Sequence, residues 1–518
     1  MQAHRPSRLR SLACPPRLLA ALASFVLLVP SAARAQVIQI KTLPIAEGDQ
    51  WRIFPSANAA MGDVSIALDD SLLDPFVNPA KGSRVTRGGA FFGSPTFYSL
   101  SERAGGGKTL PIGGLVRSGN SFAAFTLAIQ ELDTGRAETE FIHPGIPTTD
   151  GAPIVTSSPS RQNRYAFGSI GRAFPSRALS VGASVLWSGL NDVDGTDLLY
   201  AGSAGVVQHG GSFDARLGVT KDWALAAGRQ TLEAIVLHDH FSMTHDVTWP
   251  QQVWDPNTRT FATDARLDHN LDRTDTWGLQ LGLSRPLSDS LWRIGAVATG
   301  NLASHPKLPD YTLAQQIVVV PWDPGHSTAG DIGLGVSKVQ GATTFGLDAI
   351  YEPIATHTWG EAQSALGTSS GATIQPGGMT TENRFHFSNA ILRSGVGRDI
   401  DLGNHQTLRL EAGVGLRAID YNLHEIDHVA ETERRQHVQW NEWTRTWGLS
   451  LHFDNLELRY AGRSTTGTGR PGIIPEGVIE APGVDATGSN ILAAPNGSLS
   501  LTGLTTTTHQ FSVSLPVR

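Results

Sequence analysis

Residues 408–418 read Leu-Arg-Leu-Glu-Ala-Gly-Val-Gly-Leu-Arg-Ala, and apolar residues occupy every second position of this run. Side chains of a β-strand point alternately to the two faces of the sheet, so one face of the run is apolar while the other carries Arg409, Glu411 and Arg417. The run exceeds the about five or six residues common in globular strands and matches the length that a tilted strand needs to cross a bilayer. The same alternation recurs at 277–283, 345–351 and 447–453.

Strands of this kind are expected along most of the chain. We count sixteen, and fourteen would also fit, because strand boundaries read from sequence are uncertain by several residues. They lie near 87–99, 108–118, 121–131, 163–173, 177–189, 210–220, 231–242, 273–285, 289–301, 327–338, 342–354, 383–397, 405–420, 436–453, 455–465 and 506–517.

The predicted connections alternate between short turns and long loops. Long loops are expected at 132–162, 190–209, 243–272, 302–326, 355–382, 421–435 and 466–505. Short turns at one end and long loops at the other are typical of outer-membrane barrels, whose turns are periplasmic and whose loops are extracellular. We therefore expect an all-β fold, a transmembrane antiparallel β-barrel of about 14–16 strands. A barrel of this size encloses more space than its own side chains fill, so it is either an open pore or closed by an N-terminal lumen plug (hatch), which we expect here.

Composition agrees with a lipid-exposed barrel. Charged residues make up 17 % of the chain, against about a quarter in typical soluble proteins. A soluble β-protein would show the same alternation, but aromatic residues near strand ends favour the interfacial girdles of a membrane barrel over an ordinary core. These aromatic residues are Trp187, Trp277, Trp292, Trp440 and Tyr351.

Residues 1–35 are expected to be a signal peptide. Arginines precede the apolar run 18–29, which is too short to span a bilayer as a helix, and Ala33-Arg34-Ala35 is a small-x-small cleavage site before Gln36. The alternative is a membrane-anchoring helix. Cys14, the only cysteine, lies in this leader, so the expected mature chain has no disulfide, thiolate nucleophile or cysteine metal ligand. The leader holds five arginines and no acid while the whole chain carries −7, so the mature chain is more negative still and no nucleic-acid partner is expected.

Residues 36–86 are predicted to form the hatch segment, and residues 87–518 the barrel with its long extracellular loops. Within the former, Ala60-Met61-Gly62, Ala67-Leu68-Asp69-Asp70 and Asn78-Pro79-Ala80 follow one another in order. This order resembles the start of the long-chain fatty-acid transporter (FadL/TodX) family and of the outer-membrane PorV-type proteins. The resemblance is sharp only around residues 57–80. In the FadL/TodX family this segment closes the lumen, which implies hatch roles for Met61, Gly62, Asp69, Asp70, Asn78, Pro79 and Ala80; alternatively, Asn78-Pro79 simply starts the first strand.

Charged residues opposite the apolar strand faces are expected to point into the lumen. They could pair across strands and hold the hatch, or line a passage for polar solutes. These residues are Asp214, Arg216, Asp348, Arg409, Glu411, Arg417, Glu457 and Arg459.

Two patterns could bind a metal, although neither is complete. His238-Asp-His240 places two imidazoles on one strand face without a third ligand at fixed spacing. Asp192, Asp194 and Asp197 resemble a calcium loop that lacks its closing glutamate. We therefore expect no metal and no cofactor. The catalytic motifs Gly-x-Ser-x-Gly, His-Glu-x-x-His and the Walker loop do not occur, so we do not expect an enzyme.

The function implied by the resemblance is passive uptake of small hydrophobic molecules, such as long-chain fatty acids, across the cell outer membrane. The expected partners are outer-membrane lipid and a hydrophobic small-molecule ligand. Two alternatives stay open: a PorV-like barrel that anchors or shuttles secreted partner proteins, and a general porin.

Overall fold

The computed structural model describes residues 48–85, 88–101, 104–134, 161–194, 205–255, 260–287, 291–306, 324–362, 364–471 and 501–517. The predicted signal peptide, the first part of the predicted hatch segment and Asp197 lie outside these residues.

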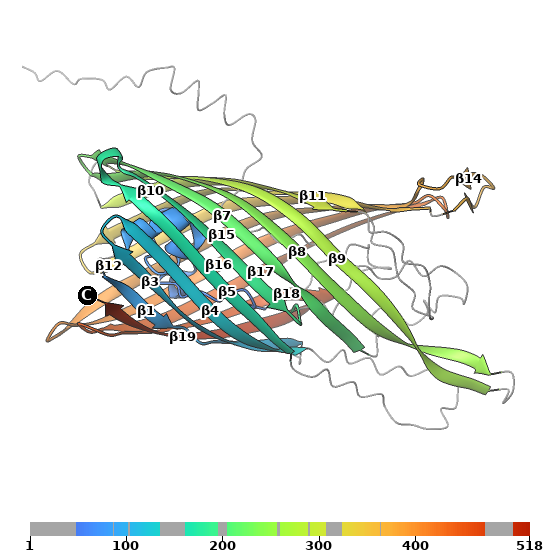
Figure 1. The fold of residues 1–518 in the computed structure, drawn as a ribbon, viewed down its shortest axis with the longest axis horizontal. Coiled ribbons are helices and arrows are strands. Elements are labelled where there is room, and N and C mark those ends of the chain that lie inside the picture. Colours follow the sequence, from blue (N-terminus) through green and yellow to red (C-terminus); the bar gives the residue numbers. More distant parts are fainter. Residues whose placement is uncertain are drawn as a thin grey trace, which may run out of the picture.

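A closed antiparallel barrel dominates the molecule (Figure 1). Its strands are β1 (Gly88–Gly93), β2 (Thr96–Leu100), β3 (Gly105–Ser118), β4 (Ser121–Thr134), β5 (Arg161–Phe174), β6 (Leu179–Leu190), β7 (Gly205–Leu225), β8 (Gly228–Asp255), β9 (Thr260–Pro286), β10 (Trp292–His305), β11 (Gly325–Gln340), β12 (Thr343–Glu361), β15 (Met379–Gly403), β16 (Gln406–Asp427), β17 (Thr432–His452), β18 (Glu457–Pro471) and β19 (Leu501–Val517). A separate two-stranded sheet, β13 (Leu366–Gly367) and β14 (Thr373–Ile374), lies between β12 and β15 in the sequence.

The barrel has sixteen strand positions, because β1 and β2 share one. Both strands pair with β3 on one side and β19 on the other, and the register is continuous across Ser94 and Pro95. The pairing of the first strand with β19 closes the barrel. All sixteen predicted strands are present, so the predicted fold class is confirmed.

The outward face of the strands forms an apolar band. Large hydrophobic side chains on this face are well exposed, for example Ile170 at 70 % and Leu334 at 63 %. Water would not tolerate such a continuous apolar surface, so lipid is its solvent and the barrel crosses a membrane. Arg445, exposed between Trp443 and Trp447, is a cation within this band.

Strand ends at the two rims differ in their connections. At the rim that carries the C-terminus (Figure 1), hairpins are tight; Asn404 and His405 join β15 to β16 with positive φ angles of 53° and 60°, the backbone twist that a two-residue hairpin needs. We call this the short-turn rim.

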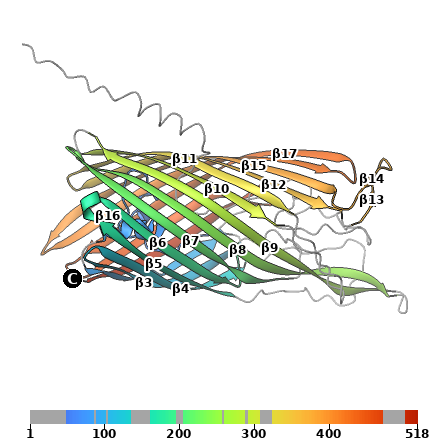
Figure 2. The same ribbon diagram turned by 45° about the horizontal axis from the view of Figure 1, so that its top comes forward.

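At the opposite rim, two of the predicted long loops are wrong. β8 and β9 stay paired through 243–272 except at the tip, and β16 and β17 stay paired through most of 421–435. These strands therefore extend well past the other strands (Figures 1 and 2). Among the described residues, no helix is both long enough and apolar enough to cross a bilayer.

Candidate functional site

Residues 48–85 lie inside the barrel, close to the short-turn rim (Figure 1, blue). Three short helices occur here: 3-10 helices at Ala59–Met61 and Pro79–Arg84, and α2 (Asp74–Val77). The helix at Pro79–Arg84 contacts β3–β7, whereas the helix at Ala59–Met61 contacts β15–β18 on the opposite wall. The segment, here called the N-terminal segment, thus crosses the lumen from wall to wall.

Asn78-Pro79-Ala80 rests on two glycines of the barrel wall. Gly182 of β6 and Gly218 of β7 are direct cross-strand partners. A Cβ at Gly218 would lie 2.1 Å from Asn78 Oδ1, and one at Gly182 would lie 2.6 Å from the Pro79 carbonyl oxygen. Asn78 Oδ1 also accepts a hydrogen bond from the Ala80 N–H (3.1 Å), which caps the helix that Pro79 begins. The motif is therefore a turn seated in a groove without side chains.

Met61 and Gly62 occupy a second glycine groove on the other wall. Gly346, Gly395 and Gly413 of β12, β15 and β16 are cross-strand neighbours. A Cβ at Gly395 would lie 2.1 Å from the Met61 carbonyl oxygen, and one at Gly413 would lie 2.4 Å from the Gly62 nitrogen. Both approaches are closer than any real Cβ contact, so only glycine admits the segment here. We call residues 60–67 the strap.

Polar side chains beside this groove satisfy the backbone of the strap. Thr446 Oγ1 accepts a hydrogen bond from the Gly62 N–H (2.9 Å) and donates one to the Ala60 carbonyl (2.8 Å). Asp348 Oδ2 accepts from the backbone N–H groups of Ser65 (2.7 Å) and Ile66 (3.2 Å). Buried backbone groups need such partners, so these side chains fix the position of the strap.

Asp69 and Asp70 have different roles. Asp70 is buried and accepts hydrogen bonds from Ser56 Oγ (2.6 Å) and from the backbone N–H groups of Ala57 and Leu73 (both 2.9 Å). It therefore holds two turns of the N-terminal segment together. Asp69 instead forms ion pairs with Arg84 (3.1 Å) and Arg229 (3.8 Å), and so links the segment to β8.

Aromatic packing anchors the segment on the β1–β5 side. Phe76 is 1 % exposed and stacks on Phe54, with ring centroids 4.6 Å apart. Its edge-to-face partners on the wall are Phe92 (5.7 Å) and Phe167 (5.2 Å). Burial of four aromatic rings together stabilises this docking.

Beside these rings, Lys81 pairs with Asp74 (3.0 Å) and with Glu233 of β8 (2.9 Å). Burial, reinforced by the negative charges of Asp69, Asp70 and Glu233, outweighs the attraction of Lys81 and raises the pKa of Asp74 to about 7. The pKa of Lys81 is raised by Asp74 and Glu233 although burial opposes the shift. Within this cluster, Asp74 is the group whose pKa lies near neutral pH.

A second ionic cluster joins the segment to β18 and β19. Arg52 and Arg463 both contact Asp63 Oδ2, at 2.6 and 3.2 Å, and Arg52 also bonds Asp49 (3.0 Å). Burial alone would raise the pKa of Asp49, but the Arg463 and Arg52 guanidinium groups outweigh it and hold that pKa below its usual value.

The eight charges predicted to face the lumen all lie on the strand face that the N-terminal segment contacts. Arg216 bonds Asp214 (2.5 Å) and the Val77 carbonyl (3.4 Å). Arg409 bonds Glu411 (2.7 Å) and approaches Met61 Sδ (3.4 Å), whereas Arg417 pairs with Glu352 (2.7 Å) away from the segment. Glu457 and Arg459 pair with each other.

Sequence reasoning missed several of the docking residues. Glu233, Thr446 and Arg463 stand on polar faces of alternating strands, so the alternation could have identified them. The glycines of the two grooves had no such signal, because a strand glycine does not reveal what approaches it.

Above the N-terminal segment, toward the extended strands, the polarity of the two strand faces is inverted. Residues that face the lumen at this level form an inner apolar cluster of Ala329, Ile354, Phe385, Phe387, Ile419, Tyr421 and Leu423, with Val438 and Trp440 packed against it. Phe385 and Tyr421 are 0 % exposed.

The inner apolar cluster contains one continuous row across five strands, in the register Ala329–Ile354–Phe387–Tyr421–Val438. The outward side chains at this level are instead polar: Asp420 binds His437 (2.9 Å) and Gln439 (2.5 Å). Strands here meet water on the outside and an apolar interior. Trp440 was predicted to lie in an outer aromatic girdle, but it packs against the inner apolar cluster. That prediction is wrong because Trp440 lies on the part of β17 where the apolar face of the strand points into the lumen.

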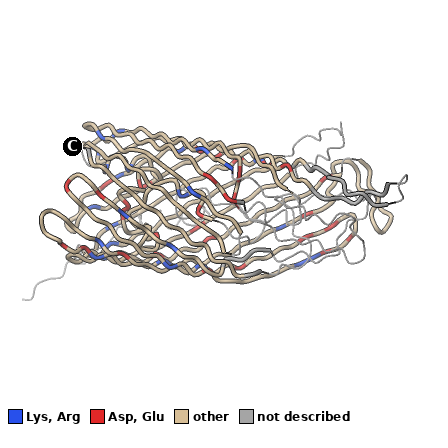
Figure 3. Tube along the Cα trace, turned by 90° about the horizontal axis from the view of Figure 1, so that it is seen from below, with Lys and Arg blue, Asp and Glu red and all other residues tan. Residues whose placement is uncertain are grey.

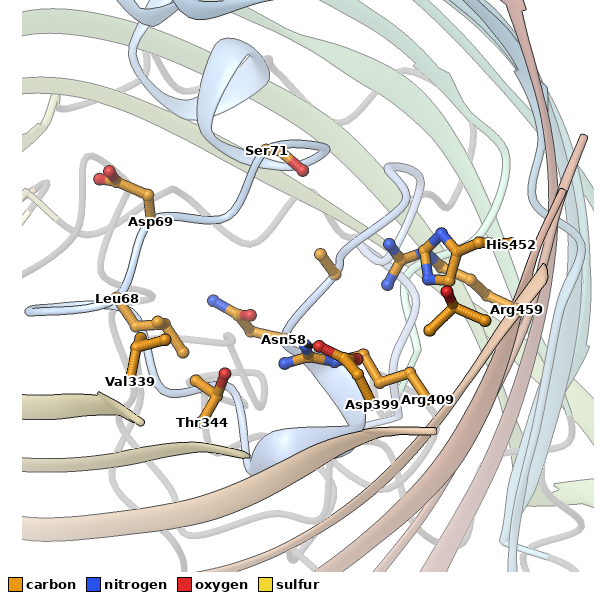
Figure 4. Close-up of a pocket in the computed structure, with 12 residues that line it drawn as sticks. Asn58, Leu68, Asp69, Ser71, Val339, Thr344, Asp399, Arg409, His452 and Arg459 are labelled. Atoms are coloured by element: carbon orange, nitrogen blue, oxygen red, sulfur yellow. Dashed lines mark hydrogen bonds and ion pairs between the residues drawn. The ribbon is translucent and has the colours of Figure 1, made fainter. Parts of the chain in front are cut away.

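A cavity of about 440 Å³ lies between the N-terminal segment and the turns of β11–β18 at the short-turn rim (Figure 4). Its lining is mixed: Leu68 and Val339 are apolar, whereas Arg409, Arg459 and His452 are polar or charged. Asp69 and Asp399 also line it, so the cavity does not select one sign of charge.

The described residues of the two possible metal patterns, which leave out Asp197, do not assemble a metal centre. His238 and His240 face outward beside Asp275, at 3.6 and 2.9 Å, and His238 stacks on Trp277. Asp192 is buried against Gln208 and Asn163, and burial raises its pKa to about 7. Within the described ranges, no group of three or more His, Cys, Asp or Glu residues could hold a metal ion.

No protein-family model matches the chain, and no curated protein matches it. Among solved structures, the Pseudomonas putida toluene transporter TodX is 12 % identical with a TM-score of 0.38, over 92 % of this chain and 100 % of that chain. The Ralstonia pickettii toluene transporter TbuX is 11 % identical with a TM-score of 0.37, over 90 % and 100 %. The copper transporter OprC is 10 % identical with a TM-score of 0.32, over 83 % and 81 %. At these values, what those proteins transport is not carried over to this chain.

Proposed function

We propose that this chain is an outer-membrane transport protein through which small hydrophobic molecules, such as long-chain fatty acids, enter passively. The main observation in support of this proposal is the inner apolar cluster. A water-filled lumen is lined by polar side chains, whereas here a row of apolar residues, including Phe387 and Tyr421, faces inward above the membrane band. Phe387 and Tyr421 are 3 % and 0 % exposed, so a solute would reach this row only when these side chains part from their neighbours. Transfer of an apolar solute from water to such an apolar lining would lower its free energy.

The proposed path has two stages. The extended strands β12 and β15–β17 present the inner apolar cluster on the side of the long connections, which is the extracellular side in outer-membrane barrels. The N-terminal segment then closes the lumen beneath it. The strap is the part expected to move, because the hydrogen bonds and ion pairs that hold it can be exchanged for hydrogen bonds to water. Residues 74–84 are instead anchored by buried aromatic packing.

The test measures uptake of a labelled long-chain fatty acid and of toluene by cells with and without the gene. A Phe387→Asn/Tyr421→Asn double variant makes the centre of the apolar row polar. The matched control, Ser388→Asn/Asn422→Ala, changes the outward face of the same two strands. We expect about tenfold slower uptake in the inner double variant, about the cost of losing 1–2 kcal/mol of apolar contact, and unchanged uptake in the control.

Folding of both variants is checked by their heat-modifiable mobility in detergent gels. Equal uptake by folded inner and outer variants, or by cells with and without the gene, would refute the proposal.

The alternative of a general porin is less favoured, because a porin needs an open lumen and the N-terminal segment spans this lumen from β3–β7 to β15–β18. The anchoring of a secreted partner, which the PorV-type resemblance implies, would show as a stable complex in a pull-down with uptake unaffected.

A further inference from the structure

The outward face of the short-turn rim carries five cations on five strands. We call them the cationic rim: Arg172, Lys221, Arg285, Lys338 and Arg398. Each shares its face with exposed apolar residues of the membrane band; Arg285 stands opposite Ile294, and Arg398 opposite Leu410. The rim therefore lies at the edge of the lipid-facing band, and not in the lumen.

Three of these cations lie over aromatic rings on the same outward face. Arg172 is 6.0 Å from the Phe174 ring, Lys221 is 5.8 Å from the Trp223 ring and Lys338 is 5.1 Å from the Trp292 ring. Aromatic side chains of membrane barrels sit at headgroup level. The adjacent cations are thus held at the depth of lipid phosphates.

Several outward cations at the rim of the extended strands have carboxylate neighbours, although Arg164, exposed on the outward face of β5, has none in the part of the chain that the structure describes. At the rim of the extended strands, Arg384 pairs with Glu382 and Arg435 with Glu433, both at 2.6 Å, and Lys108 stands directly opposite Glu131. Among the described residues, no carboxylate pairs with any member of the cationic rim, and the outward strand positions there hold no Asp or Glu. Figure 3 shows Lys and Arg, in blue, at the end of the barrel where the C-terminus lies.

We propose that the cationic rim is a docking surface for anionic phospholipids of the membrane leaflet at the short-turn rim. Charge complementarity selects the partner: five cations without protein carboxylates face the layer where phosphate diesters lie, and anionic surfaces attract such side chains. The neighbouring aromatic rings and Leu or Ile side chains contact the acyl chains of the same lipids. This surface depends on the transmembrane fold and not on the proposed transport.

The experiment reconstitutes the purified full-length protein with an equimolar mixture of phosphatidylglycerol and phosphatidylcholine, then measures retained lipid by native mass spectrometry. The rim variant is Arg172→Gln/Lys221→Gln/Arg285→Gln/Lys338→Gln/Arg398→Gln. The control variant, Lys108→Gln/Arg384→Gln/Arg435→Gln, removes cations from the opposite rim. We expect the wild type and the control to retain about threefold or more phosphatidylglycerol over phosphatidylcholine, and the rim variant to lose this preference.

Equal retention of the two lipids by the wild type, or an unchanged preference in the folded rim variant, would overturn the proposal. Inorganic phosphate is the second arm, because the same cations could hold a free anion. If millimolar phosphate abolishes the preference, the rim binds phosphate in general and the assignment to a lipid is wrong. Heat-modifiable mobility confirms that each variant is folded.

Discussion

At the scale of single residues, absent side chains determine where the N-terminal segment docks. Gly413 and Gly415 lie two residues apart on the same face of β16. A Cβ at Gly413 would lie 2.4 Å from the Gly62 nitrogen, whereas one at Gly415 would meet nothing closer than Thr444 Cβ at 3.5 Å. Substituting each glycine in turn therefore distinguishes the effect on docking of the segment, expected only at Gly413, from the effect on strand propensity, expected at both positions.

We expect Gly413→Ala to lower the stability of the docked segment by about 1–3 kcal/mol, the usual cost of overpacking, and Gly415→Ala to be close to neutral. The measurement is the apparent melting temperature of each purified variant in detergent. Similar shifts for the two variants would mean that the close approach of Gly62 does not govern the docking.

Asp74 makes the docking pH-dependent. Its pKa is raised from 3.8 to about 7 inside the barrel, chiefly by burial. A carboxyl whose pKa is higher in the docked state contributes stability that is fully present below pH 3.8 and is lost as the pH rises through about 7. We expect wild-type melting temperatures to fall over this window, and Asp74→Asn, which cannot ionise, to show a flatter profile.

The pH series is recorded in one detergent at constant ionic strength, since the Lys81–Asp74 pair is partly screened by salt. An unchanged slope in Asp74→Asn would assign the pH dependence to a group other than Asp74.

At the scale of elements, the strap is predicted to move during transport. A Cβ at Gly346 would lie 3.3 Å from Val64 Cβ, close to the about 3.8 Å typical of a disulfide. We expect a Val64→Cys/Gly346→Cys variant to cross-link under oxidation, to lose uptake of the labelled probes, and to regain it with reductant. The single-cysteine variants are the controls, and full uptake by the cross-linked protein would contradict a moving strap.

Element positions were predictable from the sequence, but element lengths were not. All sixteen strands were predicted, because alternation in runs such as 408–418 reports which face meets lipid. The stretches 243–272 and 421–435 were predicted as loops, yet Phe241 and Met243, or Tyr421 and Leu423, continue the alternation with its apolar phase turned inward. The prediction looked for strands whose apolar face points outward to lipid. It therefore missed these stretches, where the outward face meets water and the apolar face points inward.

The candidate site was predictable to a similar, partial degree. Charges such as Asp348 and Arg409 were assigned to the lumen-facing strand face by period alone, and the structure places them beside the strap. The residues that these charges contact could not be predicted, because the spacing of residues within one strand does not indicate which distant segment of the chain packs against that strand. The glycine grooves and the inner apolar cluster arise only when neighbouring strands are in register.

At the scale of the whole molecule, the barrel and the segment inside it make opposite contributions to permeability. Sixteen-stranded barrels enclose an aqueous channel unless something fills them. In this chain, residues 48–85 cross that space and contact both walls. The conductance of the protein should therefore be set by the segment and not by the diameter of the barrel.

We expect the wild-type protein to show little steady conductance in planar bilayers, and a variant lacking residues 48–85 to conduct like an open porin, because removal of the segment leaves the lumen unfilled. Gly413→Ala provides an intermediate that keeps the whole chain: a loosened strap should give brief openings on a closed baseline, whereas Gly415→Ala should match the wild type. If the wild type already conducts as steadily as the deletion variant, water passes around the segment, and the barrel functions as a porin despite its apolar interior.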